Sequence, residues 1–156
     1  MARQVKKVLF VAVVIAFIAS LVVAFVKIGK LEKTKDLSSV SYSIGTLNEQ
    51  DGAEKSSDYA LRTGYQKADK FNKIELAEKA DVVYVVFYYN TDKEFIGKTE
   101  DISQTLSEIA ETQTVNGATE KVKYFRVVVK VPETKEKVTL LNKGDYVKQI
   151  TVTLNK

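Results

Sequence analysis

The hydrophobic residues of this chain follow two patterns, one continuous block near the N-terminus and a series of short alternating runs after it. The block VLFVAVVIAFIASLVVAFV covers residues 8–26 and holds no charged residue, no Pro and no Gly. At 1.5 Å per residue, a helix of this length spans about 28 Å, close to the hydrocarbon thickness of a bilayer. The block therefore predicts a single transmembrane helix, after a short basic tail at 1–7 and before a charged stalk at 27–39.

A cleaved signal peptide is the alternative interpretation of the same block. Signal peptides have apolar regions of about 7–15 residues and end at a small-residue cleavage site. This block is longer, although Val22-Val23-Ala24 resembles a weak cleavage site. Lys and Arg lie on both sides of the block, so the flanking charges do not select an orientation. We expect a signal anchor, with the N-terminus in the cytoplasm and the large domain outside the cell, because long domains are translocated largely regardless of charge.

From residue 40 onward, short runs alternate between apolar and polar residues, the period typical of half-buried strands. The first run is Val40–Ile44, and the last, at 146–154, places Ile150, Val152 and Leu154 on one side. Further strands are predicted at 59–65, 73–76, 81–89, 94–97 and 121–131, with turns at Asp51-Gly52 and Asn116-Gly117.

One segment between these strands has a helical spacing instead. In DISQTLSEIAET, residues 101–112, the apolar residues Ile102, Leu106 and Ile109 fall on one helical face, and Asp101 with Gln104 resembles a capping box. We therefore predict one short surface helix at 101–112. The many short strands predict that residues 40–156 form an all-β, antiparallel β-sandwich domain.

The run DVVYVVFYYNTDKEF, residues 81–95, is the densest in strand-forming residues and has two interpretations. Either the strand is covered on both faces, or one face is in the core and the other presents an aromatic platform. Phe87 favours Val83, Val85 and Phe87 as the core face, which leaves Tyr84 and Tyr88 on the opposite face.

The run KVKYFRVVVKV, residues 121–131, places Tyr124 and Arg126 on one face, and an arginine in mid-strand is costly to bury without a partner. If this strand and the 81–89 strand share a sheet, four side chains form one candidate ligand-binding patch: Tyr84, Tyr88, Tyr124 and Arg126. Tyrosine rings stack on sugars, and the arginine fork binds hydroxyls or carboxylates. The plainer alternative is that these are ordinary strand residues and that Arg126 meets a surface acid.

Composition narrows the chemistry. The chain has no His and no Cys, which excludes Ser-His-Asp and Cys-His nucleophile systems and His/Cys zinc sites. A carboxylate-based glycosidase remains the residual enzymatic alternative, although no motif brings two acids together. Asp51 and Asp92 are weak calcium candidates, with an ordinary Asx turn as the alternative at each. We otherwise expect no cofactor and no catalytic residue.

The net charge of +4 does not indicate a nucleic-acid partner. Arg3, Lys6 and Lys7 in the N-terminal tail supply most of it, and basic and acidic residues nearly balance in the rest of the chain. No run of Lys and Arg is interleaved with aromatic residues.

Four strings carry a resemblance that covers about residues 40–156: YSIGTLNEQDG, VVYVVFYYNTDKEFIGKT, KYFRVVVKV and YVKQITVTLNK. They resemble small, membrane-anchored bacterial and phage β-sandwich proteins of jelly-roll type, and carbohydrate-binding modules of the galactose-binding-like kind. The resemblance implies a non-catalytic extracellular module that binds envelope glycan. The chain departs from such modules in having no Trp. The alternative is a structural or protein-interaction component of a cell envelope or phage particle, with protein partners and no sugar site.

Overall fold

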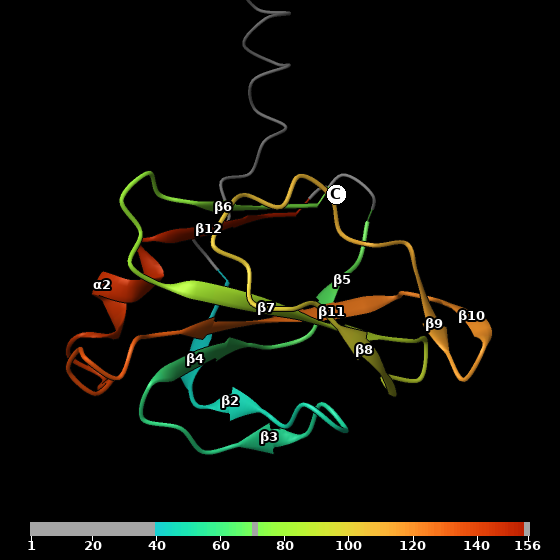
Figure 1. The fold of residues 1–156 in the computed structure, drawn as a ribbon, viewed down its shortest axis with the longest axis horizontal. Helices are drawn as coiled ribbons and strands as arrows, with labels where there is room; N and C mark the ends of the chain where they lie inside the picture. The colour runs from blue at the N-terminus through green and yellow to red at the C-terminus, as the bar shows by residue number, and fades with distance from the viewer. Residues whose placement is uncertain (1–39, 70–71, 155–156) are drawn as a thin grey trace, which may run out of the picture. The chain divides into compact units, whose positions relative to one another are not determined.

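The computed structural model of the chain describes residues 40–69 and 72–154, which belong to one compact unit, Asp36–Lys156. The predicted transmembrane block at 8–26, the tail before it and the stalk after it lie outside the described residues. Within the described part of the chain, no helix is both long enough and apolar enough to cross a membrane. That part is mostly antiparallel β-sheet with little helix, so the all-β prediction is confirmed (Figure 1).

One main sheet organises the domain. Its strand order is β1-β4-β11-β7-β8, and β5 also pairs with β11, all antiparallel. The two central strands, β7 and β11, consist almost entirely of aromatic and β-branched residues, which suit a pleated, buried surface. The strands cover Tyr42–Ile44 (β1), Ala60–Thr63 (β4), Gln66–Lys67 (β5), Val83–Tyr89 (β7), Phe95–Lys98 (β8) and Tyr124–Lys130 (β11).

Three smaller pairs surround this sheet. In Figure 1 the β6–β12 pair lies on one side of the main sheet and the β2–β3 pair on the other, while the β9–β10 hairpin extends from one end. A short helix, α2 (Lys143–Val147), precedes β12. The pairs consist of β2 (Thr46–Leu47) with β3 (Glu54–Lys55), β6 (Lys73–Leu76) with β12 (Ile150–Thr153), and β9 (Thr112–Val115) with β10 (Ala118–Lys121).

Hydrophobic clusters therefore cover both faces of the main sheet. The larger cluster lies toward β6–β12 and includes Ile74, Tyr84 and Phe125, each with no exposed surface. The smaller cluster lies toward β2–β3 and includes Leu47 and Phe87. Burial on both faces explains why the sequence of β7 is one continuous apolar run and does not alternate between apolar and polar residues. Of the two interpretations of this run, the strand covered on both faces is confirmed.

The predicted helix at 101–112 is wrong. The segment is extended, and its backbone pairs with two strands: Ile102 exchanges two hydrogen bonds with Tyr84 in β7, and Leu106 exchanges two with Ile74 in β6. The physical reason is an open edge, because β8 pairs with β7 only from Phe87 onward and leaves the first half of β7 unpaired on that side. The three residues that suggested a helical face do turn toward the larger cluster, so their burial was predicted correctly and their backbone was not.

The other predicted strands are present; β6 has the predicted bounds and the rest have shifted ends. The last strand begins at Ile150 rather than residue 146, because Tyr146 and Val147 belong to α2. The sequence pattern did not predict β2, β3 or β5, which are two residues each and lack a detectable period. It also predicted only the turn at Asn116-Gly117 and not the strands β9 and β10 on either side of it.

Candidate functional site

The register of β7 and β11 decides which predicted site residues share a face. The two strands are adjacent, as the predicted patch requires, and Arg126 lies opposite Phe87 while Tyr124 lies opposite Tyr89. Residues directly opposite in an antiparallel pair point to the same face. Tyr124 and Arg126 therefore face β2–β3, whereas Tyr84 and Tyr88 face β6–β12. The prediction that all four side chains form one patch is wrong.

Tyr84 and Tyr88 are part of the core. They are 0% and 4% exposed, and the Tyr84 hydroxyl donates a hydrogen bond to the Gln104 carbonyl at 2.9 Å. Burial raises the pKa of each hydroxyl to about 12. A sugar ring has no access to either tyrosine, so the structure leaves only Tyr124 and Arg126 from the predicted set as site residues.

Arg126 is a buried cation with its hydrogen bonds satisfied. Its side chain is 5% exposed, its Nε donates to the Thr63 carbonyl at 2.8 Å, and its Nη2 donates to Glu54 at 2.8 Å. The guanidinium also lies 5.0 Å from the centre of the Tyr65 ring. A buried guanidinium needs such partners, because removing it from water is costly. Arg126 therefore links β11 to Thr63 and Glu54, and its buried side chain has little surface with which to contact a ligand.

Glu54 in β3 joins Arg126 to a second arginine. Its other carboxylate oxygen lies 2.7 Å from Nη2 of Arg62, which comes from β4, so one carboxylate bridges two guanidiniums. The Arg62 side chain is 14% exposed, and its buried Nε has no hydrogen-bond partner within the described residues. The hydrogen bonds from Arg62 and then Arg126 lower the pKa of the Glu54 carboxyl. The Glu54 side chain itself is 58% exposed, so water screens both interactions.

The exposed part of this face is a pair of tyrosines that we call the tyrosine pair, Tyr65 and Tyr124. Tyr65 is 40% exposed, and its ring meets the Tyr124 ring edge-on at 6.3 Å and the buried Tyr89 ring at 4.9 Å. The ammonium of Lys93 lies 5.1 Å and 5.7 Å from the centres of the Tyr65 and Tyr124 rings. Two rings, a lysine above them and a buried arginine below them form an amphipathic surface that water reaches.

Sequence reasoning missed Tyr65 because strand alternation places it on the wrong face. Leu61 and Thr63 in β4 point toward β6–β12, and strict alternation would send Tyr65 the same way. β4 ends at Thr63, and Gly64 and Tyr65 are outside any strand, so the Tyr65 ring contacts Arg126 instead. A glycine that interrupts a strand was the available signal.

The β2–β3 pair closes one side of this face. The buried Tyr89 hydroxyl donates a hydrogen bond to the Gly52 carbonyl at 3.0 Å, in the turn between β2 and β3. Gly52 has φ +68°, and a Cβ at this position would lie 2.7 Å from the Tyr89 hydroxyl oxygen. Only glycine therefore fits both the turn and the tyrosine at this point.

The calcium candidates Asp51 and Asp92 lie in turns. Asp51 accepts a hydrogen bond from the Ala53 backbone at 2.9 Å, and the Asp92 backbone donates one to the Asn90 side chain at 3.0 Å. Within residues 40–69 and 72–154, no cluster of three or more acidic residues is arranged to hold a metal ion. The Asx turns account for both segments, and a structural calcium stays a prediction.

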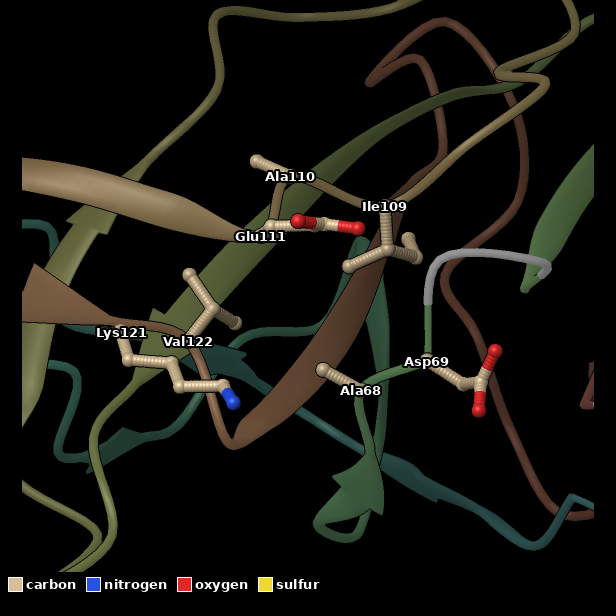
Figure 2. A pocket seen from close by; sticks show the side chains of 7 residues that line it. All are labelled: Ala68, Asp69, Ile109, Ala110, Glu111, Lys121 and Val122. Carbon is tan, nitrogen blue, oxygen red and sulfur yellow. The ribbon is translucent and has the colours of Figure 1, made fainter.

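A separate pocket lies at the opposite end of β11 from Lys130, with a volume of about 270 Å³. Figure 2 shows its lining, in which Asp69 and Glu111 come from segments far apart in sequence and the Asp69 side chain is directed away from Glu111. The remaining lining residues are Ala68, Ile109, Ala110, Lys121 and Val122. This arrangement does not aim two carboxylates at one point, as glycosidase chemistry requires.

Comparison of the chain with protein-family models, with curated proteins and with solved structures gives no match. The resemblance to carbohydrate-binding jelly rolls therefore stays a prediction.

Proposed function

We propose that the protein is a membrane-tethered, non-catalytic module that binds envelope glycan outside the cell through the tyrosine pair. The observation that carries the proposal is the exposed Tyr65 ring, which lies edge-on to Tyr124 and is supported from below by Arg126. Partly exposed tyrosines offer an apolar ring face and a polar hydroxyl, which together match the mixed surface of a sugar. In this proposal the predicted transmembrane block at 8–26 tethers the module to the membrane. The module itself is a β-sandwich of jelly-roll type.

The packing of the two rings supports a binding role. Tyr65 packs against the buried Tyr89, and Tyr124 is held in a central strand. Rings fixed before binding lose little conformational entropy when a ligand arrives. Two rings at 79° form a corner rather than a flat platform, so the proposed ligand contacts one ring with its face and the other with its edge.

Retention on glycan tests this proposal. The full-length chain in mild detergent is passed over purified cell-wall glycan and over a panel of immobilised oligosaccharides, beside Tyr65→Ala and Tyr124→Ala. The expected result is retention of the parent chain and loss of retention in both variants. The matched control is Tyr59→Ala, a partly buried tyrosine six residues earlier, about 20 Å away along an extended chain. Thermal melts show whether each variant stays folded.

Absence of retention by the parent chain on every glycan would reject the proposal. Equal loss of retention in Tyr59→Ala would also reject the assignment to the tyrosine pair, because that change would then act through folding rather than through the site.

A second candidate function, interaction with a partner protein, rests on a different surface. Leu140 and Leu141 are 77% and 97% exposed, side by side, before α2. The Asn142 side chain holds this turn by accepting hydrogen bonds from the Thr139 backbone and hydroxyl. Two adjacent exposed leucines form a small apolar surface that a partner protein could cover. Crosslinking in the native membrane, with Leu141→Ser as the comparison, tests this candidate, and an unchanged crosslinking pattern in the variant would reject it.

A further inference from the structure

Two lysine side chains that form no ion pair within the described residues lie beside the tyrosine pair. Lys93 lies above both rings, and Lys67 in β5 is exposed directly opposite Tyr124 in the register with β11. Opposed side chains of an antiparallel pair share a face and lie about 5 Å apart at Cβ. Within the described residues, neither Lys67 nor Lys93 forms an ion pair with a carboxylate, whereas lysines 73, 98, 130, 135, 137 and 148 do.

Three acids in the neighbouring strands and turns bond to groups other than these two lysines. Glu54 is shared between Arg62 and Arg126, so one negative charge meets two positive charges. Glu94, next to Lys93 in the sequence, accepts a hydrogen bond from the Asn90 side chain at 2.8 Å. Asp51 lies in the turn between β2 and β3, near Tyr89, and its carboxylate accepts a hydrogen bond from the Ala53 backbone N–H. Within the described residues none of these carboxylates forms an ion pair with Lys67 or Lys93, so both ammonium groups are available to an anionic ligand.

The backbone of Lys93 fixes its position over the rings. Lys93 has φ +63°, a conformation that few non-glycine residues adopt, in the turn that ends β7. Its amide donates to the Asn90 carbonyl at 3.2 Å, and the Asn90 side chain accepts from the amides of Asp92 and Glu94. The turn is thus internally hydrogen-bonded, and it places the Lys93 ammonium over the two rings, where the ring quadrupole attracts a cation.

We infer that the ligand of the tyrosine pair is an anionic glycan, a sugar chain that carries carboxylate or phosphodiester groups at regular intervals. This inference rests on the proposed glycan-binding function and specifies its substrate class. A sugar ring contacts Tyr65 and Tyr124, and the neighbouring anionic group lies between the ammonium groups of Lys67 and Lys93. Lysine ammonium groups bind carboxylate and phosphate alike as point charges, so the shared chemistry is the anion beside the ring.

Binding of charged and uncharged polymers by the full-length chain in mild detergent tests the inference. The probes are polygalacturonate, a sugar-substituted polyol-phosphate polymer, and neutral dextran and chitin oligosaccharides of similar length. The expected result is binding to at least one anionic polymer about tenfold tighter than to either neutral one at low salt, a preference that shrinks as salt screens the charges. The two anionic probes distinguish a uronate source from a phosphodiester source.

Charge-removing variants complete the test. The double variant Lys67→Gln with Lys93→Gln is expected to lose about tenfold in affinity for the anionic polymer and little for neutral polymers. Lys79→Gln removes one such charge from an exposed position between β6 and β7 and is expected to change neither affinity. Tyr65→Ala is expected to weaken binding to every polymer.

The outcomes separate the inference from the proposed function. Equal affinity for charged and neutral polymers, with loss in Tyr65→Ala, overturns the inference and leaves glycan binding in place. Anionic binding that persists in Tyr65→Ala also overturns it, because the charges then act without the rings. Binding to no polymer overturns both.

Discussion

The two faces of the main sheet are built from the same two strands and are stabilised in different ways. The face toward β6–β12 is packed with large apolar side chains such as Phe125 and Tyr88, and the Tyr84 hydroxyl there donates to a backbone carbonyl. The face toward β2–β3 carries Arg62 and Arg126, which are held by one carboxylate from a strand of only two residues. The first face is a dry core, and the second is a smaller core with a charged, partly open margin.

This difference locates the surface on which a ligand can act. A packed apolar layer excludes water and ligands together, because interiors have few voids larger than a water molecule. The β2–β3 layer is too short to cover the whole of its face, so Tyr65 stays 40% exposed above Arg126. Binding residues are therefore expected where the sandwich is incomplete.

The largest effect on stability is expected from the dry face. Phe125→Ala removes a side chain with no exposed surface from the larger cluster. It is expected to lower the free energy of unfolding by about 3–5 kcal/mol, the usual cost of a phenylalanine-sized cavity. Urea unfolding measures the loss, with Tyr124→Ala, the neighbouring residue on the other face, as the matched comparison. Equal losses at the two positions would contradict the distinction between the faces.

A smaller effect is expected from the arginine. Arg126→Met keeps much of the volume but leaves the Thr63 carbonyl without its charged donor, which is expected to cost about 2 kcal/mol. Lys130→Met, on the same strand with its ion pairs nearer the surface, is expected to cost less than about 1 kcal/mol. An Arg126→Met variant as stable as the parent in urea would show that the hydrogen bonds of Arg126 do not stabilise this face.

A pH-dependent effect is expected from Glu54. The pKa of its carboxyl is lowered by Arg62 and Arg126 from an ordinary value of 4.5, so the ionised form stabilises the folded state. That stabilisation is present above about pH 4.5 and is lost as the pH falls through the lowered folded-state pKa. The stability difference between the parent and Glu54→Gln is thus expected to stay below about 1 kcal/mol at neutral pH, since the carboxylate is exposed, and to vanish in acid.

Urea unfolding from pH 7 to pH 3 measures this difference. Glu78→Gln, at an exposed glutamate between β6 and β7, is the control and is expected to match the parent at neutral pH. A Glu54→Gln difference that grows as the pH falls would have the wrong sign and would remove Glu54 as the link between the arginines.

The smallest effect on stability is expected from Tyr65. Its ring is partly exposed and contributes edge contacts with Tyr89 and Tyr124, so Tyr65→Ala is expected to cost less than about 1 kcal/mol. Thermal melting measures this loss. A loss of stability as large as that of Phe125→Ala would show that Tyr65 is a core residue. It would then argue against a ligand-binding role for the Tyr65 ring.

Much of the fold could be predicted from the sequence, and much of the site could not. The strand runs around Val83–Tyr89 and Tyr124–Lys130 are dense enough in β-forming residues to be identified without the structure. The segment at 101–112 shows the limit, because its spacing fits a helix equally well until the open edge of β7 is known. Periodicity reports which side chains are buried, and it does not report which backbone groups need partners.

The sequence by itself indicated the β-rich domain and the apolar block before it, and it excluded sites built from histidine or cysteine. The tertiary structure decided the register between β7 and β11, which separates Tyr84 and Tyr88 from Tyr124 and Arg126. It also decided the turn of the chain at Gly64, which brings Tyr65 onto the face of Arg126. Composition and period depend on local residues, whereas register depends on contacts between segments far apart in the chain, because a shift of one residue exchanges the two faces of a strand.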